Sequence, residues 1–386
     1  MQTTELIAPC HFGRESILKR EIYDLGYDIT SVDNGRVTFA GDMEAVARAN
    51  ISLWSAERIL LKTGEFKASS FDDLFEGTKA IPWADYLPAD ARFWVTKAAS
   101  VRSKLFSPSD IQSIMKKAMV DSMAGHYGIS VFPEDGASYP VRVMIKDDIV
   151  TVALDTTGES LHKRGYRKFT VKAPIAENLA ASLLMLTPWS AERILVDPFC
   201  GSGTFPIEAA LISANIAPGL HRAFTAETWD GLIPASLWED VREEAGEAVD
   251  PDIETDIQGY DIDPAAVEAA RNNARLAGVE KLIHFQVRDI SKLSHHGKYG
   301  FLIANPPYGE RLLKDDPEIW QLYAMLGERF KALDSWSMYL ISAYEQTEAA
   351  LGIKAARNRK IYNGMLRSYF YQFPGPKPAG RRKERP

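Results

Sequence analysis

The sequence predicts an α/β protein whose C-terminal half is a doubly wound, mostly parallel sheet. From about residue 173 onward, short apolar segments alternate with segments of helical periodicity. The segment 301–304 is apolar at every position, which is typical of a parallel strand covered by helices on both faces. A last pair of strand-like segments, within 361–373, flanks the turn sequence Asn363-Gly364. We therefore expect an antiparallel hairpin at the end of the sheet.

The elements of this half alternate in order along the chain. We predict strands near residues 193–197, 257–261, 282–287, 300–304 and 337–342, and helices that begin near Thr204, Pro264 and Pro317. The segment 214–255, which holds Trp229 and Trp238 among many acidic residues, is an insertion between the first of these helices and the next strand. The sequence assigns it no purpose.

The first half of the chain predicts two smaller α/β modules. A strand at 4–9, helices at 14–25 and 43–53, and two strands around Asp33-Asn34-Gly35 make a β-α-β-β-α, ferredoxin-like module over residues 1–55. A second module, 56–160, is predicted from a strand at 92–98, a helix at 109–126 capped by Ser109 or Asp110, and strands at 141–145 and 149–154 around Asp147-Asp148. No nucleophile, metal cluster or phosphate loop occurs in this half. We expect it to bind or position a partner.

Length and composition limit the class of protein. With 386 residues, of which 46% are hydrophobic and 25% charged, the chain is expected to fold into two or three soluble domains. No segment approaches the roughly 20 apolar residues of a membrane helix, and the N-terminus lacks the pattern of a signal peptide. Cys10 and Cys200 are far apart, so neither a disulfide framework nor a metal site is predicted. These features favour a cytoplasmic protein.

Basic residues gather in three runs although the net charge is −7. The net charge argues against a protein that coats nucleic acid nonspecifically. Any single run is explained by a solvated face or a disordered terminus, but three together favour a track for phosphates. The runs are Lys163, Arg164, Arg167, Lys168 and Lys172; Lys354, Arg357, Arg359, Lys360 and Arg367; and Lys377, Arg381, Arg382, Lys383 and Arg385.

A glycine turn follows the first strand of the predicted sheet. Gly201-Ser202-Gly203 lies between Asp197 and the helix at Thr204, where glycines let a ligand approach the backbone and the helix N-terminus offers N–H donors. A Walker loop would need Lys after the last glycine, and a dinucleotide fingerprint would need a third glycine where Pro206 stands. The turn therefore favours another nucleotide-like cofactor.

Acidic residues follow the next two strands. We expect Asp261 to accept the hydroxyls of a ribose and Asp289 to accept from an adenine amine, with Ile290 packed on the ring; Asp263 before Pro264 is expected to cap a helix. Because carboxyl ends of parallel strands share one edge, these side chains should line a single crevice.

The segment Asn305-Pro306-Pro307-Tyr308 follows the fourth strand without a gap. The Asn305 side-chain oxygen and the Pro306 carbonyl can both accept hydrogens of a planar amine, and Tyr308 can stack on its base. Two acceptors that hold the amine in line with a sulfonium methyl favour attack by its nitrogen. Together with the glycine turn, this predicts methyl transfer from S-adenosylmethionine to an amino nitrogen of a nucleobase.

These motifs resemble those of class I S-adenosylmethionine-dependent methyltransferases, and more narrowly of the THUMP-domain RNA guanine-N2 methyltransferases that include enzymes of bacterial 23S rRNA. The resemblance rests on the segments 197–204 and 261–263, on 305–311 with Gly309, Glu310 and Arg311, and on the linker motif 161–167. It implies a Rossmann-like methyltransferase domain with a seven-stranded sheet at 173–375. A ferredoxin-like module at 1–55, a THUMP domain at 56–160 and a basic linker at 161–172 would precede it, and a basic tail at 376–386 would follow.

The resemblance also implies roles for single residues. The catalytic set is Asn305, Pro306, Pro307 and Tyr308. The RNA-binding set in the linker is Lys163, Arg164, Arg167 and Lys168. The cofactor-binding set is Asp197, Phe199, Gly201, Ser202, Gly203, Thr204, Asp261, Ile262, Asp289, Ile290 and Asn305.

The function implied is methylation of the N2 amine of a guanosine in RNA, with 23S rRNA as the expected substrate and neither a membrane nor a metal involved. Two alternatives stay open. An adenine-N6 RNA methyltransferase would use the same acceptor loop, because the sequence does not show which base edge is read. A noncatalytic RNA-binding factor in ribosome assembly is opposed by the intact Asn305 and glycine turn, although a fold alone does not establish activity.

Overall fold

The computed structural model describes residues 4–170, 174–308, 317–364 and 366–378 and divides into two compact units. The N-terminal unit comprises Met1–Cys10, Leu18–Leu161 and Gly219–Ala245. The C-terminal unit comprises His11–Ile17, His162–Pro218 and Gly246–Pro386. The predicted insertion is thus split, and most of it belongs to the N-terminal unit.

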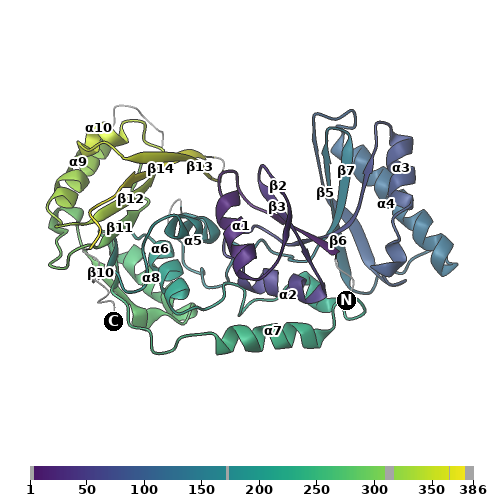
Figure 1. Cartoon of the computed structure of the whole chain (residues 1–386), viewed down its shortest axis with the longest axis horizontal. Coiled ribbons are helices and arrows are strands. Elements are labelled where there is room, and N and C mark those ends of the chain that lie inside the picture. Colours follow the sequence, from purple (N-terminus) through teal and green to yellow (C-terminus); the bar gives the residue numbers. More distant parts are fainter. Residues whose placement is uncertain (1–3, 171–173, 309–316, 365, 379–386) are drawn as a thin grey trace, which may run out of the picture. The chain divides into compact units, whose positions relative to one another are not determined.

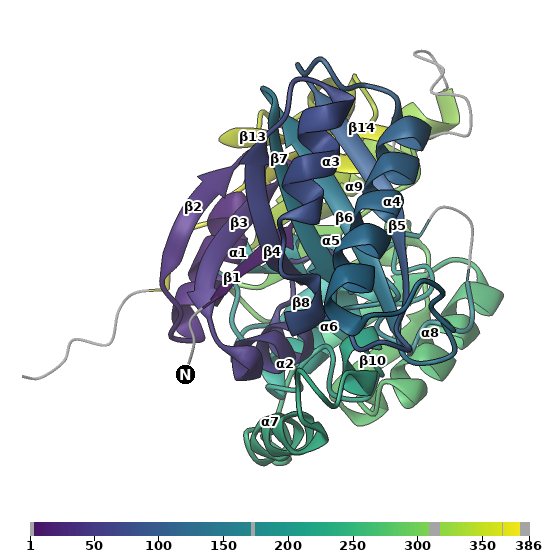
Figure 2. The ribbon, with the colours of Figure 1, turned by 90° about the vertical axis from the view of Figure 1, so that its right-hand side faces the viewer.

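One seven-stranded sheet carries both predicted modules of the N-terminal unit. Its order is β2-β3-β1-β4-β7-β6-β5, and β4 joins the modules by pairing with β1 on one side and β7 on the other. Helices α3 and α4 lie side by side across one face of the β4 to β7 half (Figure 2). The strands are β1 (Thr4–Pro9), β2 (Ile29–Asp33), β3 (Arg36–Gly41), β4 (Leu60–Lys67), β5 (Arg92–Val101), β6 (Ser138–Lys146) and β7 (Ile149–Asp155). The helices are α1 (Glu15–Asp24), α2 (Met43–Ser52), α3 (Phe71–Lys79), α4 (Pro108–Tyr127) and the short η1 (Trp83–Asp85).

Two local predictions in this unit had different outcomes. The hairpin turn at Asp147 and Asp148 is confirmed, since both residues have positive φ, of 52° and 62°. The predicted helix cap at Ser109 or Asp110 is wrong. Helix α4 begins at Pro108, whose missing N–H suits a first helical position, and no side-chain cap bond is formed by Ser107 before it.

The insertion supplies aromatic side chains to the core of the N-terminal unit. It contains η2 (Thr225–Thr228) and α7 (Ala235–Glu247). Trp229 is completely buried and its indole Nε1 donates to the carbonyl of Ser138 over 2.9 Å. Trp238 stacks on Phe224 with 5.5 Å between ring centroids. The insertion therefore has a structural purpose that local sequence patterns did not reveal.

The C-terminal unit is the predicted doubly wound sheet. Strands β10, β9, β8, β11 and β12 are parallel, and the antiparallel hairpin of β13 and β14 closes the order β10-β9-β8-β11-β12-β14-β13, as predicted. Helices α5, α6 and α8 lie on one side of the sheet and α9 and α10 on the other (Figure 1). The strands are β8 (Leu195–Asp197), β9 (Ile257–Asp261), β10 (Ile283–Val287), β11 (Phe301–Ala304), β12 (Ser337–Ser342), β13 (Arg357–Asn363) and β14 (Leu366–Phe373). The helices are α5 (Glu177–Met185), α6 (Thr204–Ser213), α8 (Pro264–Leu276), α9 (Pro317–Lys331), α10 (Thr347–Leu351) and the short η3 (Glu280–Leu282) and η4 (Ile290–Lys292).

Strand β8 lies between β9 and β11. The chain continues from β8 to β9 and β10 on one side of it, and then crosses from β10 to β11 and β12 on the other side. Such a reversal opens a crevice at the carboxyl ends of the strands, which is where ligands bind in open α/β sheets. Strands β8, β11 and β12 are buried at every position, so they form a rigid base for side chains at this edge. Within the described part of the chain, no helix combines the length and apolar character needed to cross a membrane.

Candidate active site

Four polar side chains meet at the carboxyl edge of the parallel sheet. Asp289, Asp261, Asp197 and Asn305 follow or end β10, β9, β8 and β11, which are neighbours in this order. The register pairs Asp261 with Val287, so β9 and β10 end level, and it places Asp197 opposite Gly259, two residues before the end of β9. The structure thus brings these residues to one edge, in the arrangement that the sequence predicted.

The glycine turn has the backbone geometry that requires glycine. Gly201 and Gly203 have φ angles of 52° and 86°, in the left-handed region. A Cβ on Gly203 would lie 2.9 Å from the Cβ of Ala270, so α8 packs directly against the turn. The N–H of Gly201 donates to Asp261 Oδ2 over 2.9 Å, which fixes the turn to the end of β9. Close packing of α8 is therefore a reason for Gly203 besides any ligand.

Asp197 shapes the start of this turn. Its carboxylate is buried, and Oδ1 accepts the N–H of Phe199 over 3.0 Å. Burial raises the pKa of Asp197 well above its usual range, and the nearby negative charge of Asp261 adds to the rise. The Asp197 side chain therefore holds the backbone that leads into the glycines.

Asp261 is half-buried and uses both oxygens locally. Besides Gly201, it accepts the N–H of Asp263 through Oδ1 over 3.0 Å. Each carboxylate oxygen has a second acceptor site, so Asp261 keeps capacity for a ligand hydroxyl. Asp263 caps α8 by accepting from the N–H of Ala265, as predicted. Ile262 between them is 67% exposed and offers an apolar surface beside the turn.

The next strand end differs from the prediction in one residue. Asp289 Oδ1 accepts the N–H of Ser291 over 2.7 Å, and hydrogen bonds from Ser291 lower the pKa of Asp289. Ile290 was predicted to pack on a cofactor ring, but its side chain lies in the hydrophobic core with Leu293 and Leu326. Exposed apolar side chains at this edge include Ile262 and Val287, the last residue of β10.

The acceptor loop contains a buried oxygen without a protein partner. The side-chain Oδ1 of Asn305 is buried and has no hydrogen-bond partner among the described residues. An unsatisfied buried acceptor costs about 1–3 kcal/mol, which a bound donor would recover. Pro306 is buried and Pro307 is exposed. Gly309, Glu310 and Arg311 of the predicted motif lie outside the described residues.

Tyr308 is half-buried against the core of the C-terminal unit. Burial raises the pKa of the Tyr308 hydroxyl, and a hydrogen bond with Asn363 of β13 opposes the rise. This link between the loop and the hairpin had no signal in the local sequence pattern, because the partners are 55 positions apart.

Arg164 and Arg167 of the linker contact partners within the protein and do not lie on the exposed RNA-binding surface that the sequence predicts. Arg164 is 6% exposed, and its guanidinium lies 3.4 Å from the carboxylate of Glu208, which is fully buried and also accepts from the Tyr166 hydroxyl. Arg167 donates to Thr204 Oγ1 over 3.0 Å and pairs with Glu177. A buried, paired guanidinium is not available to a phosphate. The prediction that Arg164 and Arg167 bind RNA is therefore wrong.

The outer residues of the linker keep the predicted character. Lys163 and Lys168 are exposed, whereas Lys172 lies outside the described residues.

One buried polar residue near the turn was missed by the sequence analysis. Asn273 stands on the face of α8 that buries Ala266 and Ala270, so a polar residue at an otherwise apolar position was the available signal.

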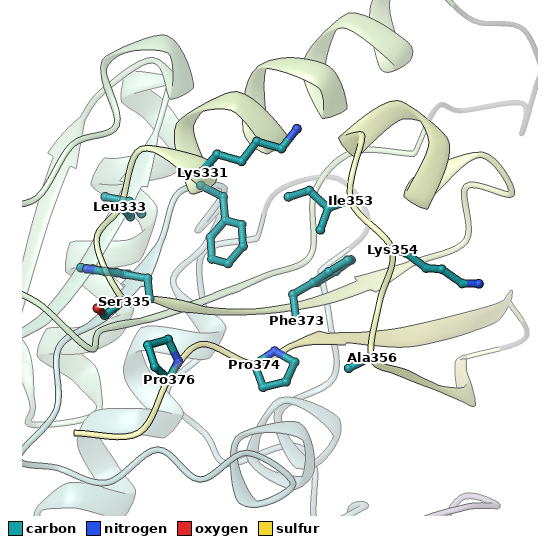
Figure 3. Close-up of a pocket in the computed structure, with 11 residues that line it drawn as sticks. Lys331, Leu333, Ser335, Ile353, Lys354, Ala356, Phe373, Pro374 and Pro376 are labelled. Atoms are coloured by element: carbon teal, nitrogen blue, oxygen red, sulfur yellow. The ribbon is translucent and has the colours of Figure 1, made fainter. Parts of the chain in front are cut away.

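A separate pocket of about 400 Å³ lies at the other edge of the sheet (Figure 3). Its lining includes Trp336, which directly precedes β12, and Pro374, which directly follows β14. Because β12 and β14 are antiparallel, both residues mark the edge opposite the carboxyl ends of the parallel strands. The pocket is therefore not part of the site formed by the glycine turn and the acceptor loop.

Three family models match the chain. A model described as "RMKL-like, methyltransferase domain" matches residues 164–371. A model of the RlmL ferredoxin-like domain matches residues 5–60, and a THUMP domain model matches residues 68–155. The first of these covers both the glycine turn and the acceptor loop.

Relatives resemble the chain over almost its whole length. YpsC of Bacillus subtilis strain 168, named as a putative RNA methyltransferase, is 42% identical over 375 residues, which cover 97% of this chain and 96% of YpsC. The crystal structure of SMU.472, described as a putative methyltransferase complexed with SAH, is 42% identical, with a TM-score of 0.92 over 98% of this chain and 100% of that chain. A structure from Listeria monocytogenes str. 4b F2365, described as a predicted N6-adenine-specific DNA methylase, is 45% identical, with a TM-score of 0.92 over 97% of each chain.

Proposed function

The chain belongs to the family of RMKL-like methyltransferases that carry an RlmL ferredoxin-like domain and a THUMP domain, and from this premise we propose that it methylates the exocyclic N2 amine of a guanosine in RNA. The methyl donor is S-adenosylmethionine, in keeping with the relative complexed with SAH. The RNA that we propose is 23S ribosomal RNA. We assign methyl transfer to residues 173–375 and RNA binding to the modules at 1–55 and 56–160.

The side chains around the glycine turn fit this cofactor. The buried hydroxyl of Ser202 has no hydrogen-bond partner within the described ranges, so it is available to a polar ligand. Asp261 and Asp289 supply acceptors for hydroxyl and amino groups, and Ile262 supplies an apolar surface. The N–H groups at the start of α6 point toward the turn and favour a negative group there. S-adenosylmethionine supplies a methyl group on a positively charged sulfur.

The observation that carries the proposal is the unpartnered Oδ1 of Asn305. We assign to this oxygen, together with the Pro306 carbonyl, the two hydrogens of the target amine. Accepting both hydrogens leaves the nitrogen lone pair directed at the methyl carbon, so that a nitrogen–carbon bond forms as the carbon–sulfur bond breaks. The amine proton leaves to water. Tyr308, the last residue of the segment 305–308, is assigned to stack on the face of the base.

An exposed aromatic and basic surface on the N-terminal unit supports RNA as the substrate. Trp94 is 39% exposed on β5, and the Arg92 guanidinium lies 5.7 Å from the centroid of its ring. Phe106, in the loop after β5, is 80% exposed, and Lys97 and Lys104 are exposed on the same stretch of chain. Aromatic faces for unstacked bases together with cations for phosphates are typical of proteins that bind single-stranded nucleic acid. In the C-terminal unit, the exposed Lys163 and Lys168 of the linker are further cations for phosphates.

An adenine-N6 methyltransferase is the second candidate. The Listeria relative is described by that activity on DNA, and an acceptor loop of this kind serves amines on either base. The match to a THUMP domain favours RNA over DNA for this chain.

Nucleoside analysis distinguishes the candidates. Ribosomal RNA from cells that lack the protein would be incubated with it and radiolabelled S-adenosylmethionine, then digested to nucleosides. We expect label in N2-methylguanosine. Label in N6-methyladenosine would establish the second candidate, and no label with naked RNA, ribosomal subunits or transfer RNA would contradict an RNA methyltransferase and favour the noncatalytic RNA-binding factor.

A further inference from the structure

The linker has an inner and an outer face within the C-terminal unit. Lys163 and Gly165 are exposed, whereas Arg164 and Tyr166 are buried, so neighbouring side chains point in opposite directions over 163–166, as in an extended chain. The alternation ends after Tyr166, whose carbonyl accepts the N–H of Lys168, so that Arg167 also points inward and Lys168 is exposed. The inner face is therefore in contact with the elements that build the cofactor turn.

Asn273 of α8 joins the linker to the glycine turn. Its side chain is fully buried and makes four hydrogen bonds. Nδ2 donates to the carbonyl of Phe169 over 2.8 Å and to the carbonyl of Ser202 over 3.1 Å. Oδ1 accepts the N–H groups of Lys168 and Phe169, over 3.2 and 3.1 Å. One amide thus holds the linker backbone and the middle residue of the turn together.

Arg167 makes a second connection from the linker side. Its Nη2 donates to Thr204 Oγ1 over 3.0 Å and to the carbonyl of Ile175 over 2.7 Å, while Nε lies 3.0 Å from the carboxylate of Glu177. Thr204 is the first residue of α6 and directly follows Gly203. Arg167 therefore holds the point at which the turn becomes a helix.

We propose that Asn273 and Arg167 are positioning residues for the cofactor. They fix both ends of Ser202-Gly203-Thr204, and thereby the N–H groups and the Ser202 hydroxyl that face the ligand. The inference rests on the proposed function, because the turn is assigned to S-adenosylmethionine there.

The conformation of the turn explains why this support affects binding and not only stability. Gly201 and Gly203 are both left-handed, and glycine has more conformational freedom than any other residue. Such a turn needs outside contacts to stay in one conformation. Without these contacts, the cofactor would have to order the turn when it binds. The conformational entropy lost in that step would oppose binding, so the affinity for the cofactor would fall.

Four variants of the full-length protein test the proposal. Asn273→Ala removes the amide. Arg167→Lys keeps the charge for Glu177 but loses the planar fork that reaches Thr204 and Ile175 together. Thr204→Val removes the hydroxyl acceptor at nearly constant shape. Asn272→Ala is the matched control, because Asn272 is the neighbouring residue on α8 and contacts the exposed Arg275 instead of the turn.

Calorimetric titration with S-adenosylhomocysteine gives the dissociation constant of each variant. We expect Asn273→Ala and Arg167→Lys to raise it about tenfold, the size of one lost buried hydrogen bond. The KM for S-adenosylmethionine should rise by the same factor, while kcat at saturating donor and the KM for RNA stay within about twofold. Asn272→Ala should bind like the parent protein.

A double-variant comparison separates positioning from plain stabilisation. Arg167→Lys combined with Thr204→Val should bind no more weakly than Arg167→Lys alone, because both changes break the same contact. The inference would be overturned if the single variants Arg167→Lys and Thr204→Val each had a lower melting temperature but an unchanged dissociation constant for S-adenosylhomocysteine. This outcome can be read even if Asn273→Ala does not fold. Failure of the parent protein to bind S-adenosylhomocysteine would contradict the proposed function instead.

Discussion

Trp229 stacks on Tyr139 with 4.6 Å between ring centroids and 14° between ring planes. The two residues are 90 positions apart, and both belong to the N-terminal unit although Trp229 follows the first helix of the methyltransferase sheet in the chain. The order of segments along the chain therefore differs from their division between the two units. The core of the N-terminal unit is complete only when the inserted segment is in place.

Trp229→Ala should destabilise the protein by about 3–5 kcal/mol, because it removes a fully buried ring and the hydrogen bond to Ser138. Urea unfolding followed by tryptophan fluorescence and circular dichroism would measure the loss. Trp320→Ala is the matched control, since Trp320 on α9 is 40% exposed. Equal stability of the two variants would show that the stacking contact contributes little.

Stability should fall between pH 5 and pH 8 because of Glu208. Burial raises its pKa from 4.5 to about 7, against the opposing charge of Arg164. Because the folded-state pKa exceeds the unfolded one, this group stabilises the fold below about pH 4.5 and the contribution is lost as pH rises through about 7. The difference corresponds to about 3 kcal/mol.

Glu208→Gln tests this dependence. The variant should be close to the parent protein in stability below about pH 7, where the Glu208 carboxyl is protonated and uncharged like the amide, and its urea midpoint should vary less with pH than that of the parent protein. Burial also raises the pKa of Asp197, so a smaller slope of the same sign should remain. An unchanged slope in Glu208→Gln would show that Glu208 does not titrate in this range.

Lys163→Ala combined with Lys168→Ala should weaken RNA binding in a salt-dependent way. Two lost phosphate contacts would reduce the slope of log affinity against log salt by about 1.5, with the affinity for S-adenosylhomocysteine unchanged. Arg164→Ala should differ, because it leaves Glu208 buried without its cation and lowers the melting temperature. Filter binding at several salt concentrations, together with thermal unfolding, distinguishes the two. RNA affinity that is unaltered at low salt in the lysine variant would remove the linker from the RNA surface.

The carboxyl edge of the parallel sheet was predictable because local pattern and topology agree there. The strand 301–304 is apolar throughout, and polar residues end or follow four of the parallel strands, so the rule for open α/β sheets places those residues together: Asp197, Asp261, Asp289 and Asn305. Other features depend on long-range pairing. Strand β4 was missed because its burial pattern is irregular, and it is stabilised by β1 and β7. Arg164 stands in a run of basic residues, which is why the sequence predicts it to be exposed. Its guanidinium is buried beside the carboxylate of Glu208, 44 positions away, and the local sequence pattern does not show this pairing.

Asn305→Ala, measured in single-turnover methyl transfer to RNA, tests most directly whether the unpartnered Oδ1 holds the target amine. Binding of S-adenosylhomocysteine and of RNA would be titrated on the same preparation, with Asn272→Ala as the control. We predict a rate at least a hundredfold below that of the parent protein with both affinities within about threefold. A rate close to that of the parent protein, at unchanged affinities, would contradict the role of Asn305 and with it the proposed methyl transfer at this loop.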